Sequence, residues 1–237
     1  ITPQDIYAHV DAGGALPKTS AVNVDEYRAL FAEALEDADA VVHINISSEM
    51  SACHQNAVIA AEGLPVYPVD SRNLSTGSAH LAIAACDLAA DGMDAQAISD
   101  ALRGMADRVD ASFLLSRLDY LHKGGRCSAI AALGANILKL RPCIEVRGGK
   151  MGVGRKYRGP FQRCLDQYVR DRLEGAADID TKRVFITHSG LPEETIEAVR
   201  RTVAALQPFE EIHITRAGCT ISSHCGDGTL GVLYVKK

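Results

Sequence analysis

Apolar residues follow strand-like and helix-like spacings in turn along the first half of the chain. Residues 41–46 are rich in β-branched side chains, with apolar residues at alternate positions, which predicts a strand. A second strand is predicted at residues 66–69, and helices at residues 24–35, 57–61 and 81–90 and after Asp94. Residues 81–90 are apolar enough to predict a buried helix. Strands that alternate with helices predict an α/β fold with a parallel sheet.

The pattern changes near Asp110 and predicts a second α/β domain. Strands are expected at residues 112–115, 143–147, 150–153, 184–189, 211–215 and 229–235, and helices at residues 161–173 and after Pro192. Gly148-Gly149 predicts a hairpin, so this sheet is expected to be mixed. The predicted domains are residues 1–110 and 111–237, with a ligand cleft between them.

The composition argues against several classes of function. The chain has 237 residues, a net charge of −5 and no run of five basic residues, which argues against nucleic-acid binding. No apolar stretch reaches about 18 residues, so no membrane span is predicted. Seven cysteines without a CxxC pair indicate reduced thiols of a cytosolic protein, and no histidine spacing indicates a metal site.

Small hydroxyl residues follow the first strand directly. Ser47, Ser48 and Ser51 stand where the strand gives way to a helix, and such a corner offers backbone N–H groups and hydroxyls to an anion. Thr19 and the stretch 70–77 provide two similar corners, which are expected to gather at one edge of the sheet. The alternative is that these residues only cap helices and turns.

Three further stretches are candidates for chemistry. Gly124-Gly125 could aim the side chain of Arg126 inward, or could simply end a helix. Residues 154–158 form a basic patch that suits a phosphate or an acidic partner, or merely a solvated turn. His224 is predicted to lie in a glycine-containing loop, and His188 and His54 are weaker candidates of the same kind. The lack of a GxSxG elbow, a phosphate-binding loop or an acid pair favours binding over turnover.

Seven stretches in order along the chain resemble the DegV family of bacterial fatty-acid-binding proteins, the lipid-carrying subunits of a fatty acid kinase. These stretches are PKTS (17–20), SSEMS (47–51), VDSRNLSTG (69–77), LDYLHKGGRCS (118–128), NILKLRPCI (136–144), GRKYRG (154–159) and SSHCGDGTLGV (222–232).

The resemblance implies a two-domain DegV-like α/β fold and a set of site residues. Thr19 and Ser51 are implied as carboxylate ligands, and the expected site also includes Ser48, Arg126 and His224. Arg126, Arg155 and His224 match positions of the family's phosphotransfer and kinase-docking set, and Arg155 with Arg158 is the expected partner-binding pair. The expected ligand is a long-chain fatty acid such as palmitate, stearate or oleate, held in an apolar inter-domain tunnel.

The resemblance also implies a cytoplasmic carrier that is not itself an enzyme, that needs no cofactor and that presents its ligand to a separate kinase. The sequence departs from the family pattern at Ala21-Val22, Ala52-Cys53 and Gly226-Asp227-Gly228, and the family's first strand would precede Ile1. One rival hypothesis is a phosphotransferase or hydrolase that uses His224 or His188 at the anion site. Another is an α/β domain whose serines are only caps.

Overall fold

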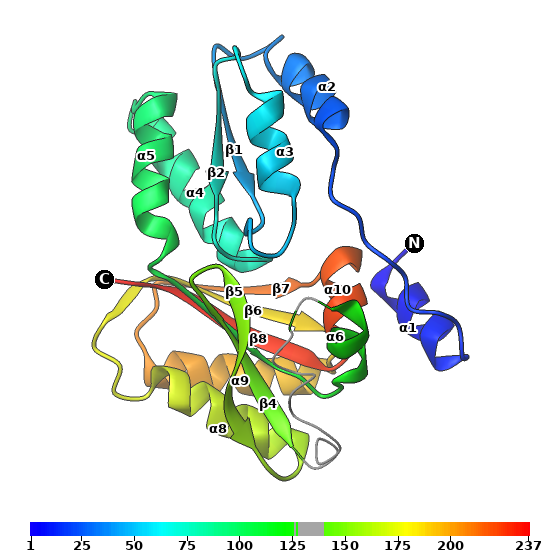
Figure 1. Ribbon diagram of the computed structural model, residues 1–237. Helices are drawn as coiled ribbons and strands as arrows, with labels where there is room; N and C mark the ends of the chain where they lie inside the picture. Colours follow the sequence, from blue (N-terminus) through cyan, green and yellow to red (C-terminus); the bar gives the residue numbers. More distant parts are fainter. Residues whose placement is uncertain (126, 128–139) are drawn as a thin grey trace. The chain divides into compact units, whose positions relative to one another are not determined.

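The computed structural model describes residues 1–125, 127 and 140–237 and consists of two compact units (Figure 1). Unit 1 comprises residues 1–19, 110–147 and 151–237, and unit 2 comprises residues 20–109 and 148–150. The first nineteen residues are therefore grouped with the second half of the chain. The predicted domains, residues 1–110 and 111–237, stay a prediction.

Unit 2 is built on two short parallel strands. In β1 (Val41–Asn45) and β2 (Val66–Asp70), Val41 lies opposite Val66 and Asn45 opposite Asp70. Four helices surround the strands: α2 (Val24–Ala34), α3 (Cys53–Ala60), α4 (Thr76–Ala90) and α5 (Ala95–Ala106). Figure 1 shows α2 and α3 on one side of the strands and α4 and α5 on the other. Because both strands run the same way, the chain leaves their carboxyl ends at one edge, as predicted.

Local sequence signals set two helix starts. α2 begins after Asn23, whose side chain accepts the Glu26 N–H at 2.9 Å, while the Glu26 carboxylate accepts the Asn23 N–H at 2.9 Å. This reciprocal capping box satisfies two backbone donors and confirms the predicted start. α1 (Pro3–Asp11) starts in the same manner, with Thr2 and Asp5 as the pair.

The prediction of a buried helix at residues 81–90 is only half right. The segment is helical as the second part of α4, but Leu81 is its only buried residue, and the remainder is half-buried or exposed. The apolar composition reflects the run of alanines and the helix propensity they bring. A described sheet of two strands is too narrow to cover the whole length of a fifteen-residue helix.

Among its described residues, unit 1 contains a mixed sheet of six strands in the order β5-β4-β3-β8-β6-β7. β3 pairs antiparallel with β4, while β6 pairs parallel with β7 and antiparallel with β8. The strands are β3 (Val109–Leu114), β4 (Arg141–Arg147), β5 (Lys150–Tyr157), β6 (Ile179–Ser189), β7 (Glu211–Arg216) and β8 (Thr229–Lys236). A small parallel sheet and a larger mixed sheet confirm the predicted α/β class.

Five helices belong to unit 1, counted over its described residues. They are α1, α6 (Asp119–Gly124), α8 (Phe161–Leu173), α9 (Glu193–Leu206) and α10 (Cys219–Cys225). α8 and α9 lie together on one face of the six-stranded sheet (Figure 1). The helix predicted at residues 161–173 and the helix predicted after Pro192 are both confirmed.

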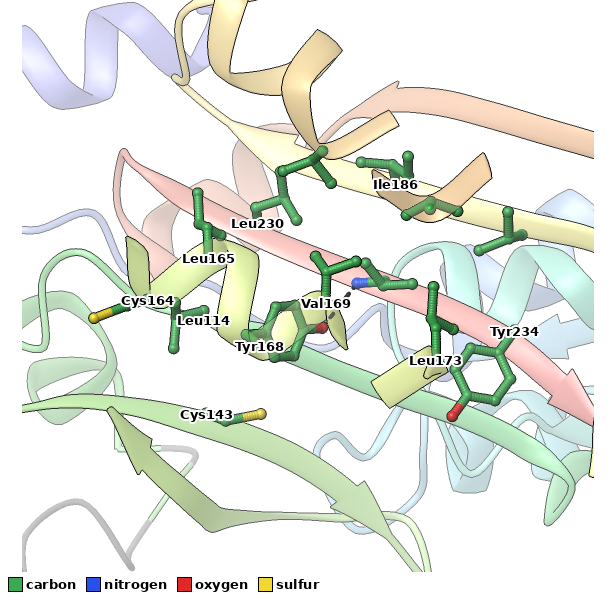
Figure 2. Close-up of a cluster of buried hydrophobic side chains, with 14 of the residues drawn as sticks. Leu114, Cys143, Cys164, Leu165, Tyr168, Val169, Leu173, Ile186, Leu230 and Tyr234 are labelled. Atoms are coloured by element: carbon green, nitrogen blue, oxygen red, sulfur yellow. Dashed lines mark hydrogen bonds between the residues drawn. The ribbon is translucent and has the colours of Figure 1, made fainter. Parts of the chain in front are cut away.

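The main core of unit 1 lies between that face of the sheet and α8 and α9 (Figure 2). Tyr168 is fully buried there, and its hydroxyl accepts the Val232 N–H at 2.9 Å and donates to the Ser112 carbonyl at 2.8 Å. A buried hydroxyl needs such partners, because an unsatisfied polar group in a core is costly. Tyr168 thus ties α8 to β3 and β8.

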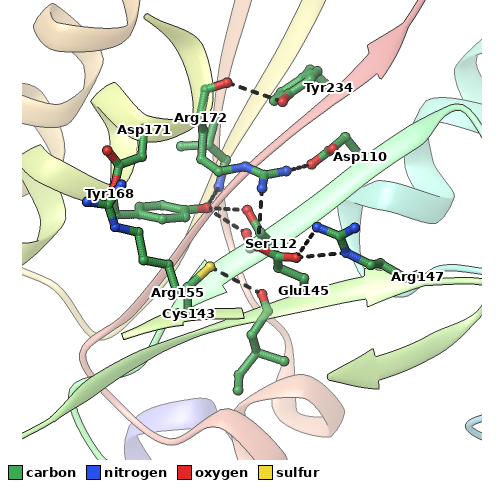
Figure 3. A network of polar contacts seen from close by, with 12 residues as sticks. Asp110, Ser112, Cys143, Glu145, Arg147, Arg155, Tyr168, Asp171, Arg172 and Tyr234 are labelled. Carbon is green, nitrogen blue, oxygen red and sulfur yellow. Dashed lines mark hydrogen bonds and ion pairs between the residues drawn. The ribbon is translucent and has the colours of Figure 1, made fainter. Parts of the chain in front are cut away.

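A polar network closes one end of this core (Figure 3). The Arg172 guanidinium pairs with the Asp110 and Glu145 carboxylates, and Arg147 binds the second Glu145 oxygen at 2.6 Å. Arg172, Asp110 and Glu145 are each at most 16% exposed at the side chain, so these charges stay in the fold only because they are paired. The network joins α8 to β3 and β4.

Candidate functional site

In unit 1, Thr19 and His224 meet. The Thr19 Oγ1 lies 2.8 Å from the His224 Nε2, although the two residues are 205 positions apart in the sequence. Both side chains are half-buried, so a ligand can reach them. The structure therefore brings together two of the residues that the sequence predicts for one site.

The predicted loop around His224 is wrong. His224 lies in the last turn of α10, which begins after Gly218 and ends at the Gly226 cap with φ of 71°. The stretch Cys219–Cys225 is short and rich in serine, a composition that favours turns and caps over helix interiors. The hydroxyls of Ser222 and Ser223 instead donate to backbone carbonyls at Ala217 and Cys219.

Gly124 accounts for the close approach of α6 to His224. A Cβ atom on Gly124 would lie 2.4 Å from the His224 Nδ1, closer than any real contact allows. Gly125, with φ of 65°, is the left-handed cap that ends α6, which is the helix-end alternative considered for the two glycines. Arg126 lies outside the described residues, so its place in the site stays a prediction.

The Thr19–His224 pair suits a carboxylate. When Nε2 carries the imidazole proton, it donates to Thr19 Oγ1, and the threonine hydroxyl keeps its own hydrogen for a ligand oxygen. A neutral hydroxyl and an imidazole can therefore hold a carboxylate without forming a salt bridge. In that tautomer the ring donates to the hydroxyl and cannot take its proton, so the arrangement supplies orientation and hydrogen bonds and not an activated nucleophile.

The serine corner of unit 2 is already well hydrogen-bonded. Ser47 N–H binds the Asn73 carbonyl at 2.8 Å, and Ser48 N–H binds the Asp70 carboxylate at 3.2 Å. The N–H groups of residues 49, 50 and 51 bind the hydroxyl or carbonyl oxygen of Ser47. The expectation that this corner leaves its backbone N–H groups free is wrong for residues 47–51, because the turn before α3 uses them internally.

The two predicted serine ligands differ in what their hydroxyls do. Ser48 is exposed, and its hydroxyl donates to the Asp70 carboxylate at 2.5 Å. Ser51 is half-buried, and its hydroxyl donates to the Cys53 Sγ at 3.1 Å. Thiol sulfur is a weak acceptor, so Ser51 can give its hydrogen to a carboxylate more easily than Ser48 can. The binding roles of both serines stay predictions.

A buried polar network beside Ser51 is absent from the sequence prediction. Asn45 is 3% exposed; its Nδ2 donates to the Tyr27 hydroxyl at 3.0 Å and lies 3.0 Å from the His43 Nε2. The His54 Nδ1 lies 3.4 Å from the Asn45 Oδ1. The two polar residues His43 and Asn45 in the mostly apolar strand at residues 41–46 were the available signal.

Burial sets the protonation of this network. Burial lowers the pKa of His43 and of His54 from the ordinary value, so both rings are neutral near pH 7. Burial, followed by the hydrogen bond with Cys53, raises the pKa of Tyr27. The network beside Ser51 is therefore uncharged, which keeps a polar but neutral surrounding around that hydroxyl.

The predicted partner-binding arginines lie at the end of β5 and just beyond it. The Arg155 guanidinium pairs with the Asp171 carboxylate at 2.8 Å (Figure 3) and lies 5.7 Å from the centre of the Tyr157 ring. Both Arg155 and Arg158 are exposed. Arg158 is therefore the more available of the two for a partner, and the partner role of both residues stays a prediction.

His188, the other histidine of the rival hypothesis, ends β6 in unit 1. Burial, reinforced by the charge of Arg216, lowers the pKa of His188. Its ring is therefore neutral near pH 7, as a general base would need to be, but the pKa of a half-buried histidine is often lowered without catalysis. Its catalytic role stays a prediction.

Residues 1–125, 127 and 140–237 contain neither a cluster of metal-ligating side chains nor a helix suited to crossing a membrane. In these ranges no three histidine, cysteine, aspartate or glutamate side chains are grouped so that they could hold a metal ion. None of the helices in the same ranges combines the length and the apolar character that crossing a bilayer requires.

The fold and the two corners define an α/β chain with candidate anion-binding hydroxyls in each unit. Residues 1–237 match the profile of the family described as "Uncharacterised protein, DegV family". The chain belongs to the DegV family.

Three relatives illustrate the match. A "Fatty acid-binding protein" of Thermotoga maritima is 29% identical over 241 residues, which cover 97% of this chain and 82% of that protein. The solved structure of a fatty-acid-binding DegV family protein from Thermus thermophilus has a TM-score of 0.88 and 29% identity, covering 100% of this chain and 85% of that one. The solved structure of a DegV lipid-binding protein from Thermotoga maritima has a TM-score of 0.85 and 26% identity, covering 98% of this chain and 82% of that one.

Proposed function

We propose that this chain binds a long-chain fatty acid and that hydroxyl groups, rather than a salt bridge, hold its carboxylate. The contact between the Thr19 Oγ1 and the His224 Nε2 at 2.8 Å carries the proposal, because it can orient a hydroxyl hydrogen toward a carboxylate oxygen. The fatty-acid-binding relatives from Thermotoga maritima and Thermus thermophilus support the choice of ligand. Ser51 is the proposed second ligand.

The acyl chain supplies most of the affinity in this proposal. Burying one CH₂ group gains about 0.8 kcal/mol, so about fourteen of them gain about 11 kcal/mol before the cost of ordering the chain. The hydroxyl donors then need only to place the carboxylate. Palmitate, stearate and oleate all fit this requirement, enclosed by an apolar tunnel of the kind that the resemblance implies.

The proposed role is that of a carrier that presents its carboxylate to a separate kinase. Hydroxyl donors leave the headgroup reachable, whereas a buried arginine would cover it. The exposed Arg158, together with the exposed Arg155 three residues before it, would contact an acidic surface of the kinase. Arg158→Glu should then weaken the interaction, while Arg201→Glu, at an exposed position on α9, should not.

Lipid extraction followed by mass spectrometry of the purified protein tests the binding proposal. The wild type should carry fatty acid, and the Thr19→Ala, Ser51→Ala double variant should carry much less. Thr202→Val is a matched control in unit 1, since its hydroxyl donates to the Ala198 carbonyl within α9, at 3.1 Å. A wild type free of fatty acid, or a double variant with an unchanged content, would overturn the proposal.

Incubation with ATP in the absence of any partner separates this role from the phosphotransferase hypothesis. A carrier should show neither phosphohistidine nor ATP turnover. A phosphohistidine at His224 or His188 that disappears in the matching His→Ala variant would favour the enzyme instead.

A further inference from the structure

Three helices that are far apart in the sequence meet in unit 1, and one of them, α10, carries the His224 of the Thr19–His224 pair. α1 leads into the segment that carries Thr19, α6 ends at Gly124 against the His224 ring, and α10 carries His224 itself. α10 packs against both α1 and α6 (Figure 1). The geometry of the pair therefore depends on the contacts that hold these three helices in place.

One connection between these helices is a chain of hydrogen bonds, all donated in the same direction, that runs from α1 to the end of α10. The Ser189 hydroxyl donates its one hydrogen to the Gly226 carbonyl. The Tyr7 hydroxyl, 2.6 Å from the Ser189 Oγ, must then be the donor of that contact. Tyr7 and Ser189 are 7% and 2% exposed. Gly226 is the cap of α10 and lies two residues after His224.

A second connection is made by the ion pairs of Arg117, which precedes α6. Its guanidinium lies 2.7 Å from the Asp11 carboxylate at the end of α1, 3.0 Å from Asp119 and 3.6 Å from Asp227 beyond α10. It also lies 5.0 Å from the centre of the Tyr120 ring, and Tyr120 in turn meets Tyr7 edge to face. The hydrogen bonds with Asp119 and Asp11 raise the pKa of Arg117, so it remains charged.

We propose that Tyr7, acting through Ser189 and the Gly226 carbonyl, is a positioning residue that holds His224 in hydrogen-bond distance of Thr19. The inference rests on the proposed function, because the pair it positions is the proposed carboxylate site. Tyr7 touches no ligand in this account. Arg117 holds the same three helices by charge, and Tyr7 sets the orientation of the α10 cap.

The test compares Tyr7→Phe with Tyr234→Phe in the full chain. Tyr234 is another buried tyrosine of unit 1, and its hydroxyl donates to the Arg172 carbonyl at 3.3 Å, within the core network rather than beside His224. Each variant loses one hydroxyl and keeps its ring. Both should lower Tm by a similar small amount, so a general loss of stability is controlled for.

The decisive readout is the ¹H–¹⁵N signal of the His224 imidazole in the ligand-free protein. Tyr7→Phe should shift or broaden this signal and weaken fatty acid binding by about fivefold to tenfold, the loss expected for one hydrogen bond. Tyr234→Phe should leave both unchanged. Ser189→Ala should reproduce Tyr7→Phe, and the double variant should be no worse than either single one, because the two act in one chain.

An unchanged His224 signal in Tyr7→Phe would overturn the inference, whatever happens to Tm. So would additive losses in the double variant. The proposed function fails separately, when the wild type binds no fatty acid, since the imidazole signal is recorded without ligand.

Discussion

At the scale of single residues, two small residues determine the positions and hydrogen bonds of the predicted site residues His224 and Ser51. Gly124 leaves the space that the His224 ring occupies, and Cys53 accepts the hydrogen of the Ser51 hydroxyl. Neither residue could be assigned this role from the sequence. The two glycines before Arg126 fit an ordinary helix end equally well, and Cys53 stood out only as a departure from the family pattern.

Gly124→Ala should damage the site directly. The new Cβ would lie 2.4 Å from the His224 Nδ1 and displace the ring, so we expect fatty acid binding to fall at least tenfold and stability to fall by about 1–3 kcal/mol. Gly104→Ala is the matched control, because a Cβ at this exposed glycine of α5 would have no atom of the described residues outside its own helix within 4 Å. It should stabilise the protein by about 0.5–1 kcal/mol. Equal fatty acid affinity in both variants would contradict the role of Gly124.

Cys53→Ser tests the contact with Ser51. A hydroxyl is a stronger acceptor than a thiol, so it should hold the Ser51 hydrogen more firmly and weaken fatty acid binding by several-fold. The exposed Cys86 provides the control as Cys86→Ser. Displacement of a fluorescent fatty acid measures both affinities. An affinity in Cys53→Ser that matches the control would remove Cys53 from the account of the site.

At the scale of helices and strands, local patterns predicted most of the fold. The strands at residues 41–46 and 66–69, the hairpin at Gly148-Gly149 and the helix that begins at residue 24 depend on neighbours in the sequence, and the structure contains all of them. α10 was missed because its serine-rich turn is stabilised by long-range packing against α1 and α6. The burial of α4 was overestimated because composition does not reveal how wide a sheet is.

The lowered pKa values of His43 in β1 and His54 in α3 predict how the stability of the protein depends on pH. Their pKa values are lowered in the folded state, so well above the ordinary histidine pKa of about 6.5 both states are neutral and the full stability is present. As the pH falls below that value, the two histidines become protonated in the unfolded chain while they stay neutral in the folded chain. The free energy of unfolding should therefore decrease by an amount of the order of 1 kcal/mol toward pH 5.

Denaturant unfolding at pH 7.5 and pH 5 measures this dependence. His43→Gln keeps a partner for the Asn45 amide but cannot be protonated, so it should reduce the loss of stability at pH 5. His122→Gln removes an exposed histidine of α6 and serves as the control. A loss at pH 5 that is identical in wild type and His43→Gln would show that the network does not resist protonation.

At the scale of the whole molecule, the sequence predicted two α/β parts but not the place of the first nineteen residues. They are grouped with the second half of the chain, in unit 1. Their contacts, such as Tyr7 with Ser189, join residues 182 positions apart, and no local pattern encodes a partner at that distance. The meeting of Thr19 and His224 became predictable only through the ordered motifs of a family, not from either residue alone.

The central claim is that uncharged donors at Thr19 hold the carboxylate of a fatty acid. The most direct measurement is a crystal structure of the protein with the fatty acid that it retains through purification. The account predicts continuous density for an acyl chain whose carboxylate lies within about 3 Å of the Thr19 hydroxyl. A carboxylate bound elsewhere, with Thr19 and His224 still bonded only to each other, would contradict it.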